Sequence, residues 1–129
     1  MVRRLLDSDG EPGLHLELPW PPSVNGYWRT VTISGRQRTL ISRKGRDYRE
    51  AVKHTIRTGP PITGRVAVVI DAYPPDRRAR DLDNLPKSIL DSLTHAGVWS
   101  DDSQIDDLRI VRRDVVPGGR IVINITEIK

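Results

Sequence analysis

Residues 65–73 read Arg65-Val66-Ala67-Val68-Val69-Ile70-Asp71-Ala72-Tyr73 and are followed by Pro74-Pro75. Their run of β-branched and small apolar residues is typical of a buried strand, and the prolines stop it. A helix is predicted next, over residues 84–96, with Gly97 as its C-terminal stop. A second strand is predicted over residues 108–115. A strand, a helix and a second strand in this order indicate a sheet with a helix packed against it.

The other predicted elements lie mostly on the N-terminal side of this unit. Alternation of apolar and polar residues, helix caps and turn residues predict a strand over residues 14–18, a stiff proline-rich loop over 19–25, a hairpin over 30–41, a helix over 42–58 and a last strand over 121–126. Residues 1–13 are expected to form a flexible N-terminal arm, and residues 14–129 a single domain. The predicted fold class is α+β, with a mixed β-sheet and two main helices packed on it.

Composition excludes several classes of protein. The chain has 129 residues, enough for one domain with a modest core. It has no cysteine, which rules out disulfides, thiolate zinc sites and a cysteine nucleophile. No segment approaches the roughly 20 apolar residues of a membrane-spanning helix, and the N-terminus lacks the pattern of a signal peptide. We therefore expect a cytoplasmic protein without a membrane partner.

The net charge of +4 is distributed unevenly along the chain. Residues 81–107, which we call the acidic segment, contain seven acids and one base and carry −6, so the rest of the chain carries +10. A basic surface of this kind is typical of proteins that bind nucleic acid, because it neutralises phosphates. The candidate DNA-binding residues are Arg43, Lys44, Arg46, Arg77, Arg78 and Arg80.

Three carboxylates and a lysine of the acidic segment are the candidate catalytic residues. Asp81 and Asp83 are two residues apart, so their side chains point the same way on an extended segment. Lys87 follows Asp83 by four residues, one turn along the predicted helix. Asp102 comes after that helix, where a chain returning to the sheet is expected to bring it near the other two. Converging carboxylates suit Mg²⁺, with Mn²⁺ as a substitute, and a nearby lysine stabilises charge on a phosphoryl oxygen.

These carboxylates also have a purely structural interpretation, because acids are common in turns and at helix N-termini. Asp83 is a good N-cap for the predicted helix. Asp91 is expected to be a solvated helix residue. Asp106 and Asp107 are expected to solubilise the chain or to pair with Arg109 and Arg112. With this interpretation, the chain is a non-catalytic basic DNA-binding protein.

A longer pattern surrounds the candidate residues. It reads Asp81-Leu82-Asp83-Asn84-Leu85 up to Lys87 and continues as Asp91-Ser92-Leu93-Thr94-His95-Ala96-Gly97-Val98-Trp99-Ser100-Asp101-Asp102. A second part, Leu18-Pro19-Trp20-Pro21-Pro22-Ser23-Val24-Asn25, lies near the start of the predicted domain. In this pattern the chain resembles the RusA family of Holliday junction resolvases, and the resemblance spans residues 14–129.

The resemblance implies a RusA-like fold and an activity. Members of this family are Mg²⁺-dependent homodimeric endonucleases that bind four-way DNA junctions and make paired nicks in recombination and repair. It places the three metal-binding aspartates at Asp81, Asp83 and Asp102 and the required lysine at Lys87. We therefore expect a RusA-like endonuclease domain over residues 14–129. Two alternatives stay open: a non-catalytic DNA-binding protein, and a metal-dependent nuclease that acts on another nucleic acid.

Overall fold

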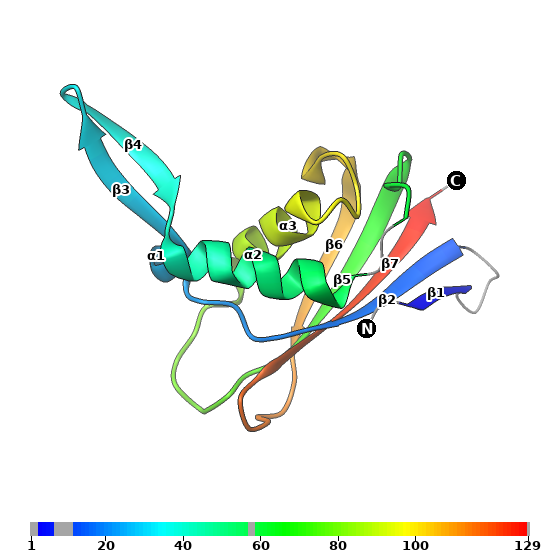
Figure 1. Ribbon diagram of the computed structural model, residues 1–129. Coiled ribbons are helices and arrows are strands. Elements are labelled where there is room, and N and C mark those ends of the chain that lie inside the picture. The colour runs from blue at the N-terminus through cyan, green and yellow to red at the C-terminus, as the bar shows by residue number, and fades with distance from the viewer. Residues whose placement is uncertain (1–2, 7–11, 57–58, 129) are drawn as a thin grey trace.

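The computed structural model describes residues 3–6, 12–56 and 59–128, which form a five-stranded sheet, a separate hairpin and helices. The strands of the sheet, in the order β1-β2-β7-β5-β6, are β1 (Arg3–Leu6), β2 (Pro12–Leu18), β7 (Arg120–Ile128), β5 (Arg65–Tyr73) and β6 (Ile105–Arg112). Helices α2 (Arg43–Thr55) and α3 (Pro86–His95) lie on one face of this sheet (Figure 1). The predicted α+β class, the mixed sheet and the two main helices are confirmed. No helix in the described ranges is long and apolar enough to cross a membrane.

The direction of the strands decides where the candidate residues lie. β5 and β6 are parallel neighbours, whereas the other neighbours in the sheet are antiparallel. A parallel pair needs a long crossover connection, and here that connection contains α3 between two 3-10 turns, η1 (Leu82–Asn84) and η2 (Asp102–Gln104). All four candidate catalytic residues therefore lie on one connection between neighbouring strands.

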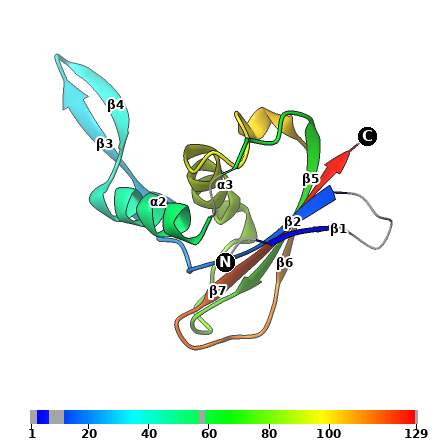
Figure 2. The same cartoon turned by 45° about the vertical axis from the view of Figure 1, so that its right-hand side comes forward.

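The hairpin predicted over residues 30–41 is present as β3 (Trp28–Ile33) and β4 (Arg36–Ile41). Its two strands form a sheet of their own, which projects away from the rest of the molecule (Figure 2). Ser34 and Gly35 join the strands with φ angles of 51° and 77°. A two-residue hairpin turn of this kind needs a positive φ at both positions.

The core lies between the sheet and the helices. Ile121, Ile123 and Ile125 of β7 are each at most 1% exposed, so they share one buried face. Val52 of α2 and Leu93 of α3 are fully buried in the same cluster. The alternation in β7 therefore fixes which face of the sheet the helices cover.

We expect Ile123→Ala to lower the free energy of unfolding by about 2–5 kcal/mol, because it leaves a cavity in a fully buried position. Unfolding in urea measures this loss. Ile128→Ala is the matched control, since it removes a side chain that is 42% exposed from the same strand. The control should change the free energy by about 0.5 kcal/mol or less. Similar losses in the two variants would contradict the placement of Ile123 in the core.

The predicted start of the second helix, and its cap, are wrong. α3 begins at Pro86 rather than at Asn84, and its N-cap is Leu85, not Asp83. Proline has no N–H to donate to the carbonyl of Leu82, which accepts from the N–H of Leu85 instead, at 3.2 Å. The residues before Pro86 therefore form a 3-10 turn, and Asp83 lies within it.

Three other predictions need correction. Val24–Tyr27 form a short helix, α1, at the end of the predicted loop, and the Ser23 hydroxyl caps it by accepting from the N–H of Gly26. β6 begins at Ile105, three residues before its predicted start, because main-chain pairing with β5 extends to that residue. Within the predicted arm, Arg3–Leu6 pair with β2 as a strand, while residues 1, 2 and 7–11 lie outside the described residues.

Candidate catalytic and nucleic-acid-binding site

The carboxylates of Asp81 and Asp83 lie at the entrance to α3. Asp81 has extended backbone angles, φ −85° and ψ 131°, and Asp83 is part of η1. Lys87 is the second residue of α3, so it is not on one continuous helix with Asp83 as the sequence spacing suggested. All three side chains are exposed, and none of them forms an ion pair within the described residues. They are available to a ligand.

Hydrogen bonds fix the segment that carries Asp102 to the residues that precede β5. Asp101 caps η2. Its carboxylate accepts a hydrogen bond from the N–H of Ser103, and this bond lowers the pKa of the Asp101 carboxyl. The Gln104 side chain amide donates to the carbonyls of Ile62 and Gly64 at 2.8 and 2.9 Å. η2 is therefore fixed although its carboxylates face solvent.

The pKa of the Asp102 carboxyl is raised from its ordinary value. Partial burial of its carboxyl raises the pKa of Asp102, and hydrogen bonding and charge repulsion from Asp101 and the charge of Asp91 act in the same direction. These partners show that Asp102 lies in a locally acidic environment beside α3. Such an environment favours either a proton or a cation at this carboxylate.

The structure does not gather the candidate carboxylates as the sequence predicted. Within the described ranges, no three Asp, Glu or His side chains form a group that could hold a metal ion. Asp81 and Asp83 precede α3, whereas Asp102 follows it and lines a shallow pocket with Leu90. η1 follows the end of β5 and η2 precedes the start of β6, and in a parallel pair these lie at opposite ends of the strands, which explains the separation.

Asp91 has a structural role that sequence reasoning missed. The Nε and Nη2 atoms of Arg49 donate to its Oδ2 at 2.9 and 2.8 Å, and the Tyr27 hydroxyl donates to the same oxygen. Tyr27 also lies 3.1 Å from the hydroxyl of Ser92. The prediction that Asp91 is a solvated helix residue is therefore wrong: it joins α1, α2 and α3. Its partners are more than 40 residues away in the sequence, so no local pattern indicates them.

A second acid of the acidic segment is also paired. Asp106 on β6 forms an ion pair with Arg65 on the neighbouring strand β5. Neither Asp106 nor Asp107 forms an ion pair with Arg109 or Arg112 among the described residues, so the predicted partners are wrong. The register of β5 against β6 explains the difference, because Arg65 begins β5 where β6 begins.

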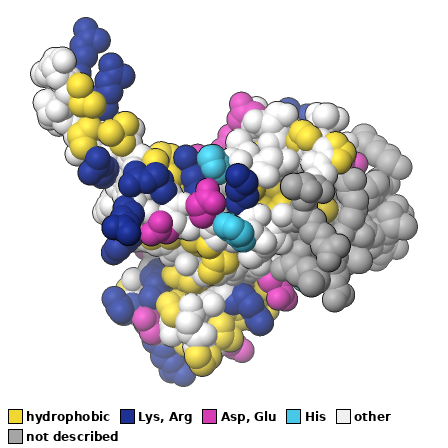
Figure 3. All heavy atoms as spheres, in the orientation of Figure 1, with side chains coloured by type: hydrophobic (Ala, Val, Ile, Leu, Met, Phe, Trp, Pro, Cys, Tyr) yellow, Lys and Arg dark blue, Asp and Glu magenta, His cyan; other side chains and the backbone are white. Residues whose placement is uncertain are grey.

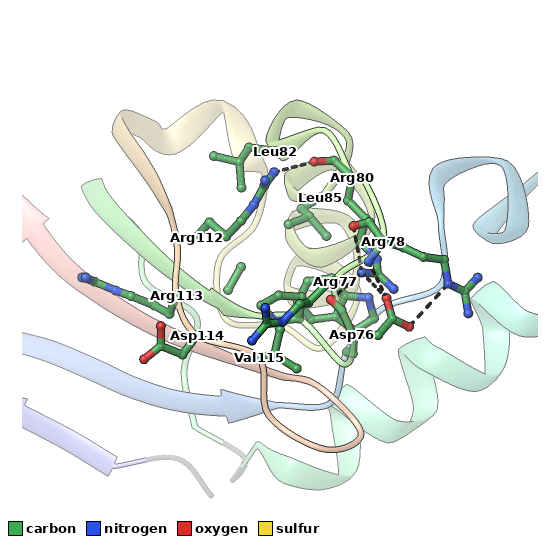
Figure 4. A pocket seen from close by; sticks show the side chains of 13 residues that line it. Asp76, Arg77, Arg78, Arg80, Leu82, Leu85, Arg112, Arg113, Asp114 and Val115 are labelled. Atoms are coloured by element: carbon green, nitrogen blue, oxygen red, sulfur yellow. Dashed lines mark hydrogen bonds and ion pairs between the residues drawn. The ribbon is translucent and has the colours of Figure 1, made fainter.

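An arginine-lined pocket of about 460 Å³ opens beside the candidate residues, in the loop that follows β5 (Figure 4). Trp20 is one of its lining residues, and the Arg80 guanidinium lies 5.6 Å from the centre of the Trp20 ring. Arg80 also pairs with Asp76 at 2.8 Å. The arginines that line the pocket are Arg77, Arg78, Arg80, Arg112 and Arg113. The pocket thus contains all three arginines that the sequence analysis selected from this loop.

The other predicted DNA-binding residues lie on a different element. Arg43, Lys44 and Arg46 are exposed in the first turns of α2, and that helix has no acid in its first turn. A helix N-terminus favours acids, so three cations at this end do not help the helix to form.

Comparison with known proteins assigns the chain to a family. The family model for Endodeoxyribonuclease RusA matches residues 19–126, which include the whole crossover connection. The chain belongs to the RusA family. Among its RusA relatives is the crossover junction endodeoxyribonuclease of Enterobacteria phage 82, which is 46% identical over 116 residues, 88% of this chain and 93% of the relative. Those of Enterobacteria phage HK97 and Escherichia coli K12 are 47% and 44% identical over 115 residues, 87% of this chain and 92% of each relative.

The RusA family match also covers the hairpin and both groups of predicted DNA-binding residues. β1 and β2 lie before the matched residues. The match therefore includes every residue for which the sequence predicted a function.

Proposed function

We propose that this RusA family chain is a Mg²⁺-dependent endonuclease that resolves Holliday junctions by paired, symmetric nicks in DNA recombination and repair. The observation that carries the proposal is the exposed set Asp81, Asp83, Lys87 and Asp102 within a family match that covers it completely. The relatives named above are crossover junction endodeoxyribonucleases. We further propose that the protein acts in the cytoplasm as a homodimer.

The ion pairs of the acidic segment exclude two of its acids from the proposed site. Asp91 and Asp106 of the acidic segment are neutralised by arginines, which gives them structural roles. Asp81, Asp83 and Asp102 form no ion pair with a described residue, although the chain contains 21 Lys and Arg. Exposed carboxylates left without a cation in a basic protein are suited to bind one from solution.

The chemistry of these residues suits Mg²⁺, which prefers carboxylate oxygens and keeps several waters for substrate to replace. Asp81 and Asp83 would hold the ion; Asp102, which the resemblance to the RusA family gives as a third ligand, is separated from them by α3 within one chain. When bound, Mg²⁺ supplies a Lewis acid and lowers the pKa of a bound water. The Lys87 ammonium would contact the phosphate that is cut and stabilise the charge that builds up on its oxygens. Arg77 would hold the neighbouring phosphates, because it is exposed at the edge of the arginine-lined pocket.

The proposed dimer follows from the shape of the substrate. A four-way junction has near two-fold symmetry, and a symmetric dimer presents two identical sites to it. Each site then cuts one of two opposing strands. This arrangement gives the paired nicks that resolution needs.

The test is cleavage of a labelled, synthetic four-way junction by the purified protein, read on a denaturing gel. We expect paired nicks with Mg²⁺ and none with a chelator. Linear duplex, single-stranded DNA and RNA at the same salt concentration are the matched controls. Junction binding without cleavage in any divalent metal would favour a non-catalytic DNA-binding protein. Preferred cleavage of one of the controls would favour a nuclease for another nucleic acid.

A further inference from the structure

The hairpin of β3 and β4 has no function in the site described above. It extends away from the sheet and the helices (Figure 1), and only its base packs against the core, through Trp28 and Ile41. Each strand has six residues, which corresponds to a length of roughly 20 Å. A two-stranded hairpin by itself is only marginally stable in water. A hairpin that projects from the domain therefore contributes little to folding stability, which points to a role in binding.

The register of the hairpin sorts its side chains onto two different faces. Residues that pair across the strands share a face, and successive residues alternate between faces. The face of Trp28 and Ile41 continues outward with uncharged Thr30, Thr39, Thr32 and Gln37. The opposite face, which we call the arginine face, consists of Arg29, Val31, Ile33, Arg36, Arg38 and Leu40. On it every cross-strand pair joins an arginine to an aliphatic residue.

The arginine face is exposed and strongly positive. Ile33 and Leu40 are 48% and 38% exposed, and none of the three arginines forms an ion pair within the described residues. Residues 28–46 contain six Lys and Arg and no acid, so the charge continues from the hairpin into the first turns of α2. Figure 3 shows the basic side chains gathered along the hairpin and the neighbouring part of α2.

The base of the hairpin is fixed to the body of the protein. The Ser42 hydroxyl donates to the carbonyl oxygen of Tyr27 at 2.9 Å, and also to that of Gly26. Gly45 packs so closely here that a Cβ atom would lie 2.4 Å from the Tyr27 carbonyl oxygen. The Tyr27 hydroxyl also donates a hydrogen bond to Asp91 of α3. The base of the hairpin is therefore joined to the crossover connection, which sets the direction in which the hairpin projects.

We infer that the hairpin is a DNA-binding β-ribbon that lays its arginine face against a duplex arm of the junction. A two-stranded ribbon fits the major groove, which is about 12 Å wide. The arginines contact phosphates on either side of the groove, and the aliphatic side chains between them contact sugars and base edges. The inference rests on the proposed function, because it names the part of the protein that holds the arm of that substrate.

A second copy of the chain is a less suitable occupant of this face. In a symmetric contact the same patch meets itself, so two arginine faces would bring six guanidinium groups together. No acid between residues 28 and 46 offsets that repulsion. Nucleic acid, in contrast, supplies negative charge along the whole length of the ribbon.

The first test compares two double variants in binding to a four-way junction in chelator, over a series of stated salt concentrations. R36Q/R38Q removes two cations from the arginine face, and K53Q/R109Q removes two exposed cations from α2 and β6. We expect the first variant to bind about tenfold or more weakly near physiological salt, with the slope of log affinity against log salt reduced by about 2. The affinity and the salt dependence of the control, K53Q/R109Q, should be closer to those of the wild type. Equal effects of the two variants would overturn the inference.

The second test locates the contact directly and does not depend on removing a charge. The chain has no cysteine, so I33C on the arginine face and T32C on the opposite face each carry a single thiol for a photo-crosslinker. We expect I33C to crosslink to a labelled junction arm several-fold more than T32C. Equal yields, or a crosslink to a second protein chain in place of DNA, would overturn the inference.

Failure of the inference is distinguishable from failure of the proposed function. If the wild-type protein neither binds nor cuts a four-way junction, the proposed function fails. If the wild-type protein cuts the junction while R36Q/R38Q retains its affinity and salt dependence, only the role of the hairpin fails.

Discussion

Cleavage of a four-way junction in Mg²⁺ is expected to fall about 10³-fold or more when Asp83 is replaced by asparagine. The amide keeps the size of the carboxylate but removes the negative charge that attracts a divalent cation. Because Asp83 is exposed and neither caps α3 nor forms an ion pair among the described residues, the loss should not come from unfolding. Single-turnover cleavage at saturating protein measures the rate of the chemical step.

The control for this variant is Asp107→Asn. Asp107 belongs to the same acidic segment and is also exposed, but it lies on β6 and has no proposed role. We expect it to cleave within about twofold of the wild-type rate, since exposed surface changes have small effects. Junction affinity in chelator should be unchanged or higher for Asp83→Asn, because a carboxylate that repels phosphate has been removed. Wild-type cleavage by Asp83→Asn would contradict the catalytic assignment.

The second large effect is expected for Lys87→Met, which should lower the single-turnover rate by about 10²-fold while junction affinity in chelator changes little. Methionine keeps the length and helix preference of lysine, so α3 should form as before. The rate falls because the variant lacks the one cation that stabilises charge in the transition state. Lys87→Arg should restore part of the rate, because it restores the charge with a different shape.

Lys53→Met is the matched change at an exposed lysine of α2 and should leave the rate unchanged. The two outcomes for Lys87→Met separate chemistry from binding. A large loss of affinity with an unchanged rate at saturation would assign Lys87 to DNA binding alone.

The strands of this fold are predictable because their side chains alternate between core and solvent. β7 shows this directly: Ile121, Ile123 and Ile125 are buried, and the period of two was visible in the sequence. The hairpin was also predictable, since the Ser34-Gly35 turn supports the positive φ angles that a two-residue connection needs. In these cases the signal lies within a few residues.

Other features depended on partners that are distant in sequence. Asp91 reads as a surface acid on its helix, and only packing with Arg49 and Tyr27 gives it a structural role. The start of α3 depended on which donor reached the carbonyl of Leu82, which helix periodicity does not show. The four candidate catalytic residues could be selected by their chemistry, but their separation across α3 follows from the parallel pairing of β5 and β6, which places η1 and η2 at opposite ends of the crossover.

The position of β6 at the edge of the sheet affects how activity would be lost. β6 pairs with β5 alone, and η2 with Asp102 leads directly into it. Edge strands open locally at a lower free-energy cost than the whole domain unfolds. Fraying of β6 would therefore leave η2 and Asp102 held only by the Gln104 hydrogen bonds, while the pairs between β2, β7 and β5 stay intact. Loss of activity on warming is then expected to precede global unfolding, and amide hydrogen exchange in β6 would report it.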